Sequence, residues 1–299
     1  MNHILTLICN PCTADLDGGI VAETAAALRQ QGAETGDADW LADGVACDLP
    51  FSGIDPQQAE AIASLHLQGF AVDINALENQ NRRKKLLIAD MDSTIVTGET
   101  LDDLAEFAGC GEKVAHITNR AMNGEIRFVD ALKERIRLLE GLPVENLERT
   151  MNAVELTPGA ETLVRTMKAN GAKSMLVSGG FTFFTKRVRD WVGFDADRGN
   201  LLEIENDKLT GGVIEPIINK AAKLDTLNAF AANHGVTLED TLAVGDGAND
   251  LPMLKAAGLG VAYHAKPVLI ESARVGIEHG DLTALLYLQG YRAKEFISS

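Results

Sequence analysis

The sequence is poor in the residues that mark several specialised protein classes. Among its 299 residues there are only 4 cysteines and 8 prolines. Four cysteines are too few for a disulfide framework in a chain of this length. The scarcity of proline, together with 46% hydrophobic residues, argues against a largely disordered or fibrous chain. We therefore expect a soluble globular protein, with the cytoplasm as its compartment.

Long apolar runs are also missing. No run approaches the roughly 18 residues that a membrane-spanning helix requires. The N-terminal "ILTLIC" has no basic leader and runs into "DLDGG", so we do not expect a signal peptide. Cys9 and Cys12 form a single C-x-x-C motif without a second pair, which favours ordinary side chains over a zinc or redox site.

Positive charge is in short supply. Lysine and arginine number 27 against 43 acidic residues, which gives a formal net charge of −16. Such a surface repels polyphosphates and anionic lipids, so we expect neither nucleic acid nor a membrane as a partner. A small anionic substrate is compatible if a metal ion, a lysine or backbone amides supply positive charge locally. We interpret the basic cluster "RRKK" at residues 82–85 as a solvated entry to the next strand.

The order of the apolar segments predicts two domains. Residues 1–80 follow a β-α-β-β-α-β order with short connections, which is typical of a small ferredoxin-like α+β module. In residues 85–299 buried strands alternate with helices, which predicts an α/β domain with a doubly wound parallel sheet. We expect a capped helix over residues 157–171, a strand ending in "VSGG" just before another helix, and a hairpin turning at Asp207 and Lys208.

The strand pattern stops at about residues 97–155. Phe128, Leu132, Ile136 and Leu139 are spaced there as on one face of a helix. This helical insertion follows the first strand of the second domain at its carboxyl end, where ligands bind in open α/β sheets. We therefore predict a helical cap that closes over the ligand.

Polar clusters follow three of the apolar strands: "DMDST" after "LLIA", "SGG" after "SMLV", and "GDGAND" after "TLAV". Asp-x-Asp pairs also occur at residues 15–17, 37–39 and 195–197, but none of these follows a buried strand. A parallel sheet would gather Asp90, Asp92, Asp246 and Asp250 near one point. Two carboxylates about 4 Å apart repel by about 4 kcal/mol at an effective dielectric constant of about 20. A hard divalent cation such as Mg²⁺ would remove that penalty.

The remaining clusters suit an anion. Ser178, Gly179 and Gly180 offer a hydroxyl and amides at a helix start, and Lys223, with Lys220 as a rival, offers a point charge. The sequence has no Walker A loop, and "GDGAND" lacks the third glycine of a dinucleotide-binding motif. A carboxylate nucleophile, a cation, amide donors and a lysine are what phosphoryl transfer through an aspartyl-phosphate needs.

The motifs "DMDST", "VSGGF", "AAK" and "GDGANDLPML" resemble, in order and spacing, the four motifs of the haloacid dehalogenase (HAD)-like phosphatases. The resemblance extends from Asp90 to the C-terminal helix through "RAMNG", "RFVDALKERIRLL" and "GLGVAYHAKP". It is closest to the family members that hydrolyse O-phospho-L-serine. It implies a Rossmann-like HAD core with a helical cap, an ACT-like N-terminal domain and Mg²⁺ as cofactor.

The resemblance also implies roles for the acidic residues. Asp90 would be the nucleophile, and Asp92 would act as general acid and then as general base. Mg²⁺ would be held by the Asp90 carboxylate, the Asp92 main-chain carbonyl and Asp246. Asp250 would support the site through hydrogen bonds.

The substrate contacts follow from the same resemblance. Ser178 and Gly179 would hold the phosphoryl oxygens, Lys223 would balance their charge, and Asn249 would help to orient the phosphate. The insertion would contribute four further residues, namely Glu99 for the substrate's ammonium, Arg135 for its carboxylate, and Met122 and Phe128 as the lining of the cap.

Three functions stay open. The leading prediction is Mg²⁺-dependent hydrolysis of phosphoserine to L-serine and phosphate, the last step of serine biosynthesis. The second is transfer of the phosphoryl group to another alcohol, or hydrolysis of another monoester such as homoserine phosphate. The third is a non-catalytic amino-acid sensor. The N-terminal domain could bind an amino acid, join two copies as a homodimer or only pack on the catalytic domain, and nothing in its residues chooses among these roles.

Overall fold

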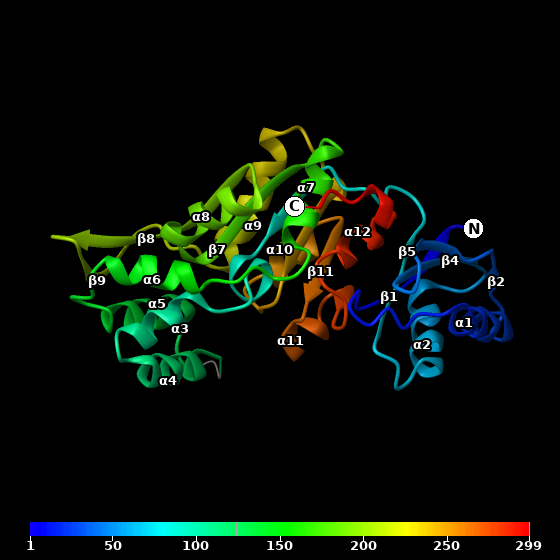
Figure 1. Cartoon of the computed structure of the whole chain (residues 1–299), viewed down its shortest axis with the longest axis horizontal. Coiled ribbons are helices and arrows are strands. Elements are labelled where there is room, and N and C mark those ends of the chain that lie inside the picture. Colours follow the sequence, from blue (N-terminus) through cyan, green and yellow to red (C-terminus); the bar gives the residue numbers. More distant parts are fainter. Residues whose placement is uncertain (123–124, 299) are drawn as a thin grey trace.

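The computed structural model describes residues 1–122 and 125–298, and the side chain of Met122 lies outside the described part. Figure 1 shows an elongated molecule with the N-terminal domain at one end, the helical cap and a long hairpin at the other, and a twisted sheet covered by helices between them. Among the described residues, no helix is long and apolar enough to cross a lipid bilayer.

The N-terminal domain is an antiparallel sheet with α1 and α2 on one face. Its strand order, β2-β4-β1-β5 with β3 beside β4, is the predicted ferredoxin-like one. Along β1, Leu5 and Leu7 pack under the helices, whereas Ile8 packs with the central domain on the other face. Asp17 and Asp55 cap the two helices through their side chains. The elements are β1 (His3–Cys9), α1 (Gly18–Gln30), β2 (Glu34–Thr35), β3 (Asp39–Ala42), β4 (Ala46–Ser52), α2 (Pro56–His66) and β5 (Val72–Glu78).

The central domain is the doubly wound α/β fold that the sequence predicts. Its sheet runs in the order β12-β11-β10-β6-β7-β8-β9, and all neighbours are parallel except β8 and β9. On the central strand β6, Leu86 and Ile88 share a core with α9, α10 and α11, whereas Leu87 and Ala89 share one with α7, α8 and α12. The elements are β6 (Leu86–Ala89), α7 (Ala160–Ala169), β7 (Lys173–Phe181), α8 (Thr182–Val192), β8 (Ala196–Glu205), β9 (Lys208–Ile214), α9 (Lys220–Asn233), β10 (Thr241–Gly245), α10 (Leu251–Ala256), β11 (Leu259–Tyr263), α11 (Pro267–Ile270), β12 (Val275–Ile277) and α12 (Ala284–Leu288).

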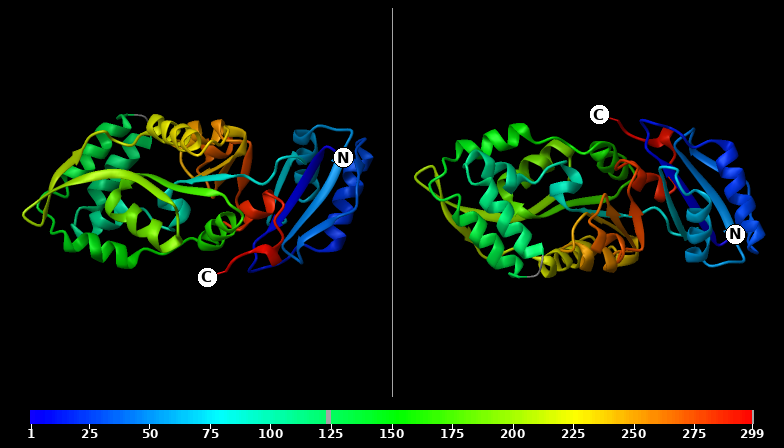
Figure 2. Two further views of the ribbon diagram at one scale, coloured as in Figure 1. Left: turned by 90° about the horizontal axis from the view of Figure 1, so that it is seen from above. Right: turned by 90° about the horizontal axis from the view of Figure 1, so that it is seen from below.

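The cap lies beyond the carboxyl end of β6, as Figure 2 shows from two sides. The chain enters and leaves it side by side, because Val96 and Leu156 form an antiparallel bridge. The described helices of the cap fall within the insertion predicted at about residues 97–155. They are α3 (Thr100–Phe107), α4 (Gly111–Met122), α5 (Phe128–Arg137) and α6 (Glu145–Ala153).

The hairpin of β8 and β9 belongs to the cap side of the molecule, which the sequence does not predict. Helix α5 packs along β9, and Pro143 of the cap forms a bridge with Lys208. The turn residues are Asn206 and Asp207, one position earlier than predicted. Their φ angles of 50° and 59° suit the type I′ turn that two-residue hairpin loops favour.

Two other predicted boundaries are wrong. The helix expected over residues 157–171 begins only at Ala160, because Gly159 has a φ of 85° and stands before the helix as its N-cap. The strand ending in "VSGG" continues to Phe181, so residues 178–180 lie in β7 and not at a helix start. The sequence also misses α11 and β12, which have 4 and 3 residues and are too short to show a period.

The basic linker is not simply solvated. The Arg82 side chain is only 13% exposed and forms a two-pronged ion pair with Asp48 of the N-terminal domain. It also donates to the main-chain oxygen of Tyr287 in the central domain. Its neighbour Arg83 pairs at the surface with Glu295. The interpretation of the cluster as a solvated entry is therefore wrong for Arg82, which fastens the two domains to each other.

Candidate active site

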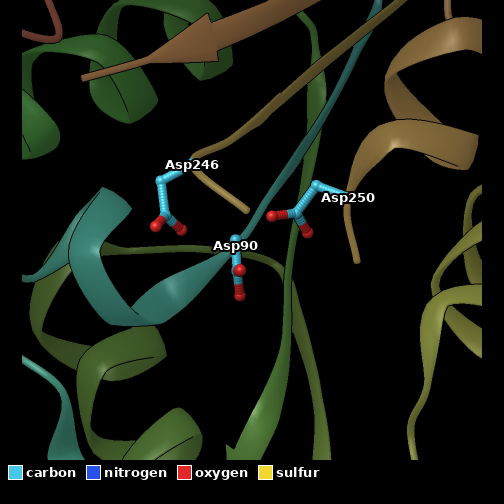
Figure 3. A group of neighbouring side chains, drawn as sticks. All are labelled: Asp90, Asp246 and Asp250. Atoms are coloured by element: carbon cyan, nitrogen blue, oxygen red, sulfur yellow. The ribbon is translucent and has the colours of Figure 1, made fainter. Parts of the chain in front are cut away.

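The carboxyl ends of β6 and β10 bring three aspartates together. These strands are parallel neighbours with Ala89 beside Val244, so the residues that follow them leave the sheet at the same edge. Asp90 follows β6, Asp246 follows β10, and Asp250 stands just before α10. All three residues are buried, and one carboxylate oxygen from each lies within 4.8 Å of the other two. Figure 3 shows the three side chains converging from separate segments.

Lys223 lies between two of these carboxylates. Its Nζ is 2.6 Å from an oxygen of Asp90 and 2.6 Å from an oxygen of Asp250. Burial alone would lower the pKa of Lys223, but the two carboxylates outweigh it and raise that pKa, so the side chain is an ammonium. Lys220, the rival in the sequence, is exposed at the start of the same helix.

Gathering three carboxylates costs free energy even with Lys223 present. Burial is the largest cause that raises the pKa values of Asp246 and Asp250, and the negative charge of Asp90 is the second. Raised values mean that the ionised forms are disfavoured in this cluster. A cation with oxygen ligands would reverse that preference.

The donor set fits Mg²⁺. Both oxygens of Asp250 are used within the protein, since Lys223 donates to one and the Gly247 amide to the other. Asp90 likewise accepts from Lys223 and from the Met91 amide, whereas the ion pair of Asp246 with Lys266 is longer, at 3.4 Å. Asp246 is therefore the carboxylate best placed to hold a cation, with Asp90 beside it, and Asp250 supports the site by holding Lys223. Hard oxygen donors in small number suit Mg²⁺, which keeps several of its waters.

Asp92 points away from this cluster because the chain turns sharply after Asp90. Asp92 has non-helical angles (φ −65°, ψ 138°) and Ser93 has a φ of 53°. One oxygen of Asp92 accepts from the amide and the hydroxyl of Thr100, at 2.8 and 2.7 Å, and the other accepts from the Ser178 hydroxyl at 2.9 Å. Burial, and then the charge of Asp90, raise the pKa of Asp92 against these hydrogen bonds, so its carboxyl is suited to hold a proton.

Residues at the carboxyl end of β7 pack closely against Asp92. The Ser178 hydroxyl accepts from the Gly180 amide at 2.7 Å while it donates to Asp92. A Cβ on Gly180 would lie 2.9 Å from an Asp92 oxygen, so a larger residue there would displace the Asp92 carboxyl group. The main-chain oxygen of Gly179 accepts from Asn200 at 2.7 Å. Ser178 and Gly179 thus keep a fixed place beside the proton-bearing group.

The cap reaches this strand end through Phe128. A Cβ on Gly179 would lie 3.3 Å from Cζ of Phe128, so the ring covers Gly179 closely. Phe128 begins α5 and is 37% exposed. A ring in this position excludes water from one side of the strand end. Met122, the other predicted lining residue, has its side chain outside the described part.

Glu99 and Arg135 bring opposite charges to the cap side of the site. Glu99 accepts from the Ser93 hydroxyl at 2.7 Å. The protein atoms crowded around its carboxyl, and then the charges of Asp92 and Asp246, raise the pKa of Glu99 to about 7, although part of the residue is open to solvent. Burial lowers the pKa of Arg135, with Glu99 among the charges that oppose the change.

Arg135 forms fewer hydrogen bonds within the described part of the chain than its N–H donors allow. Its Nη1 donates to the Thr118 hydroxyl at 3.3 Å, whereas its buried Nε has no hydrogen-bond partner within the described part of the chain. Buried donors are normally paired. An arginine with a free donor near a carboxylate can bind a zwitterion, with Arg135 taking the negative group and Glu99 the positive one.

Three residues of the site have no role in the sequence-based prediction, namely Lys266, Thr100 and Asn200. Lys266 Nζ lies 3.4 Å from a carboxylate oxygen of Asp246. It follows the parallel strand β11 directly beside β10, so the rule that located Asp90 and Asp246 could have found it. Thr100 and Asn200 act only through tertiary contacts and leave no such signal. Asn249 stands beside Asp250, with its side-chain oxygen against Gly247.

Comparisons with known proteins find close relatives. Residues 87–255 match the family described as haloacid dehalogenase-like hydrolase. A phosphoserine phosphatase of Archaeoglobus fulgidus is 48% identical over 205 residues, which are 69% of this chain and 60% of that protein. A phosphoserine phosphatase of Streptomyces coelicolor is 37% identical over 296 residues, which are 98% of this chain and 71% of that protein. The chain thus spans less than two thirds of the Archaeoglobus relative.

Solved structures agree with these relatives. A HAD family hydrolase of Salmonella enterica superposes with a TM-score of 0.84 at 30% identity, over 96% of this chain and 98% of its own. A phosphoserine phosphatase solved as a phospho-aspartyl intermediate analogue superposes with a TM-score of 0.65 at 41% identity, over 69% of this chain and 98% of its own.

Proposed function

The chain belongs to the haloacid dehalogenase-like hydrolases, and within them to the phosphoserine phosphatases, and on this premise we propose that it hydrolyses O-phospho-L-serine to L-serine and phosphate through an aspartyl-phosphate. The observation that carries the proposal is the contact between the buried Asp90 carboxylate and the buried Lys223 ammonium, 2.6 Å apart. A charged nucleophile can accept a negative phosphate only where positive charge is already in place.

Asp90 attacks the phosphorus atom. A bond forms from its oxygen to phosphorus while the bond from phosphorus to the serine oxygen breaks. Lys223 balances the charge of the phosphoryl oxygens, and Ser178, Gly179 and Asn249 orient them. When bound, Mg²⁺ would be held by Asp90, Asp246 and the main-chain oxygen of Asp92, and it would supply further positive charge.

Asp92 handles the proton in both halves of the reaction. Its raised pKa keeps a proton available for the departing serine oxygen. The resulting carboxylate then takes a proton from the water that attacks the phosphorus of the aspartyl-phosphate. Hydrogen bonds from Thr100 and Ser178 hold the carboxyl group in one orientation through both steps.

Substrate choice rests on the cap. Glu99 would bind the ammonium of phosphoserine and Arg135 its carboxylate, with Phe128 closing over the phosphate end. A phosphomonoester that lacks either group would leave one of these charges unpaired, which penalises its binding. We propose on this ground that phosphoserine is preferred to sugar phosphates.

Phosphate release tests the proposal. Purified protein is given Mg²⁺ and, in turn, phosphoserine, phosphothreonine, homoserine phosphate and sugar phosphates. We expect a clear preference for phosphoserine, loss of release when EDTA removes the metal, and an inactive Asp90→Asn protein that retains its fold. Full turnover by Asp90→Asn would exclude the covalent mechanism.

Two alternatives are outcomes of the same experiment. New phosphoesters formed in the presence of added alcohols would indicate a phosphotransferase, and serine binding without phosphate release would indicate a sensor. The cytoplasmic location and the place in serine biosynthesis stay predictions, as do the ACT-like character and homodimer formation of the N-terminal domain.

A further inference from the structure

Among the contacts between the two domains, one group of hydrogen bonds joins the N-terminal domain to residues 276–280, which include the end of β12 and the three residues after it. Asp73 of β5 accepts hydrogen bonds from the consecutive amides of Glu278, His279 and Gly280, at 2.7, 3.1 and 2.7 Å. Asp73 is 4% exposed. A buried carboxylate that satisfies three adjacent amides fixes the backbone of that segment.

Further side chains of the N-terminal domain reach the same segment. Asn75 both donates to and accepts from the main chain of Gly276, at 3.0 and 3.2 Å. Asn10 donates to the main-chain oxygen of His279 at 3.0 Å. Figure 1 shows the neighbouring β11 and α11 on the side of the central domain nearest to the N-terminal domain.

The segment is in turn bonded to the loop that carries Lys266. The ring of His264 forms a hydrogen bond through Nε2 with the main-chain oxygen of Gly280 at 2.8 Å, and the His264 amide donates to Ile277 at 2.8 Å. His264 has a φ of 42°, a strained conformation for a residue with a side chain, which persists only where the surroundings hold it.

The same loop holds Asp246. The Lys266 amide donates to the main-chain oxygen of Asp246 at 3.1 Å, and Lys266 Nζ lies 3.4 Å from its carboxylate. Hydrogen bonds therefore lead from Asp73 through Gly280 to His264. From His264 the main chain continues for two residues to Lys266, which contacts Asp246.

We propose that the N-terminal domain positions the metal-binding carboxylate of Asp246, with Asp73 and His264 as the positioning residues. The proposal rests on the proposed function, because it takes Asp246 as a ligand of Mg²⁺. It gives the N-terminal domain a role in the catalytic cycle that needs neither an amino-acid ligand nor a second copy of the chain.

The test uses full-length variants: Asp73→Ala, His264→Ala, the double variant, and the conservative His264→Gln, whose amide can still reach Gly280. Asp39→Ala is the matched control, because Asp39 also joins the domains, through Arg292, but lies outside this series of contacts. Mg²⁺ affinity is measured from the metal-induced rise in melting temperature, and the exchange rate of the Lys266 amide by hydrogen exchange.

Asp73→Ala and His264→Ala should each weaken Mg²⁺ binding about threefold to tenfold, less than the 10- to 100-fold typical of residues that bond a metal ligand directly. The Lys266 amide should exchange faster in both. The double variant should lose no more than the weaker-binding single variant, since both act on Gly280, and His264→Gln should retain most of the affinity. At saturating Mg²⁺ the KM for phosphoserine should be unchanged.

Mg²⁺ affinities equal to that of Asp39→Ala, or additive losses in the double variant, would overturn the proposal. If Asp73→Ala does not fold, His264→Ala against His264→Gln decides the question alone. Neither metal affinity nor amide exchange requires phosphoserine hydrolysis, so a failure of the proposed substrate would be seen separately.

Discussion

The ammonium group of Lys223 is almost completely buried. Its side chain is 1% exposed, and its Nζ lies 2.6 Å from each of Asp90 and Asp250. Lys223→Met keeps the volume and removes the charge, so two buried carboxylates lose their cation. We expect the free energy of unfolding to fall by about 3–5 kcal/mol and kcat to fall by about 100-fold or more. Urea unfolding and steady-state kinetics measure these losses.

Lys220→Met is the control for that variant, because Lys220 lies on the same helix and is exposed. Its free energy of unfolding should change by no more than about 0.5 kcal/mol. Mg²⁺ should restore part of the stability of Lys223→Met, since the cation would bind beside the same carboxylates. If the two variants lose activity to the same extent, the role given to Lys223 is wrong.

The raised pKa of Glu99 leads us to expect that substrate binding depends on pH. Its pKa is about 7 against an ordinary value of 4.5. Below about pH 7 the carboxyl takes up a proton and loses its attraction for the substrate's ammonium, so the KM for phosphoserine should rise as the pH falls from 8 to 6. Glu99→Gln should raise the KM at pH 8 by about tenfold or more and should flatten this pH dependence.

The control for Glu99 is a phosphomonoester without an amino group, whose KM should not rise when Glu99 takes up a proton. Stability gives a second readout. Because the folded-state pKa of Glu99 exceeds 4.5, its contribution to stability is complete below about pH 4.5 and is lost as the pH rises through about 7. A KM profile for phosphoserine that is identical in wild type and Glu99→Gln would remove Glu99 from the ammonium site.

At the scale of elements, the contacts between the cap and the central domain include an exposed ion pair. Glu148 of α6 pairs with Arg187 of α8, and Arg187 stacks 3.6 Å from the ring centre of Phe183. Exposed ion pairs contribute about 0.2–1 kcal/mol, so Glu148→Gln should favour an open cap and raise the KM for phosphoserine by at most about fivefold. Melting temperature should stay nearly constant, because the fold does not depend on this pair.

Salt discriminates this effect from a change in the site itself. Added salt screens an exposed pair, so the difference in KM between wild type and Glu148→Gln should shrink as ionic strength rises. A difference that persists at high salt would show that Glu148 acts in some way other than through Arg187.

Elements whose pattern is local could be predicted from the sequence. The runs "LLIA", "SMLV" and "TLAV" are apolar because both faces of a central parallel strand are buried, and the polar clusters that follow them mark the end of the sheet where Asp90 and Asp246 meet. The alternation of strands and helices likewise predicts both domains. Such patterns depend only on residues that are close in the sequence, so they can be recognised without a structure.

Contacts between distant elements could not be predicted in this way. The sequence around Phe128 predicts only a helix. The position of its ring over Gly179 depends on how the cap packs against the central domain. The sequence predicts the hairpin, but its packing against α5 is a contact between elements far apart in the chain, which local patterns do not show. The position of Lys266 after a strand beside β10 is a usable signal, but Lys266 has no acidic residue next to it in the sequence.

At the scale of the whole molecule, the two domains behave as one unit in their packing. Ile8, Leu41 and Val45 of the N-terminal domain share an apolar cluster with Leu285 and Tyr291 of the central domain. A large apolar interface holds two domains in place against each other and couples their unfolding. We therefore expect the N-terminal domain to unfold together with the sheet and not before it.

Arg82 tests that expectation. It pairs with Asp48, which is 34 residues away, and donates to Tyr287, which is 205 residues away, so sequence alone could not distinguish it from its basic neighbours. Arg82→Ala leaves the Asp48 carboxylate, which is 4% exposed, without its cation. The free energy of unfolding should fall by about 3–5 kcal/mol. Arg83→Ala, which breaks an exposed pair with Glu295, should cost about 1 kcal/mol or less. Calorimetry of Arg82→Ala should show a single transition at lower temperature, whereas two separated transitions would mean that the domains fold independently and that Arg82 only fastens them.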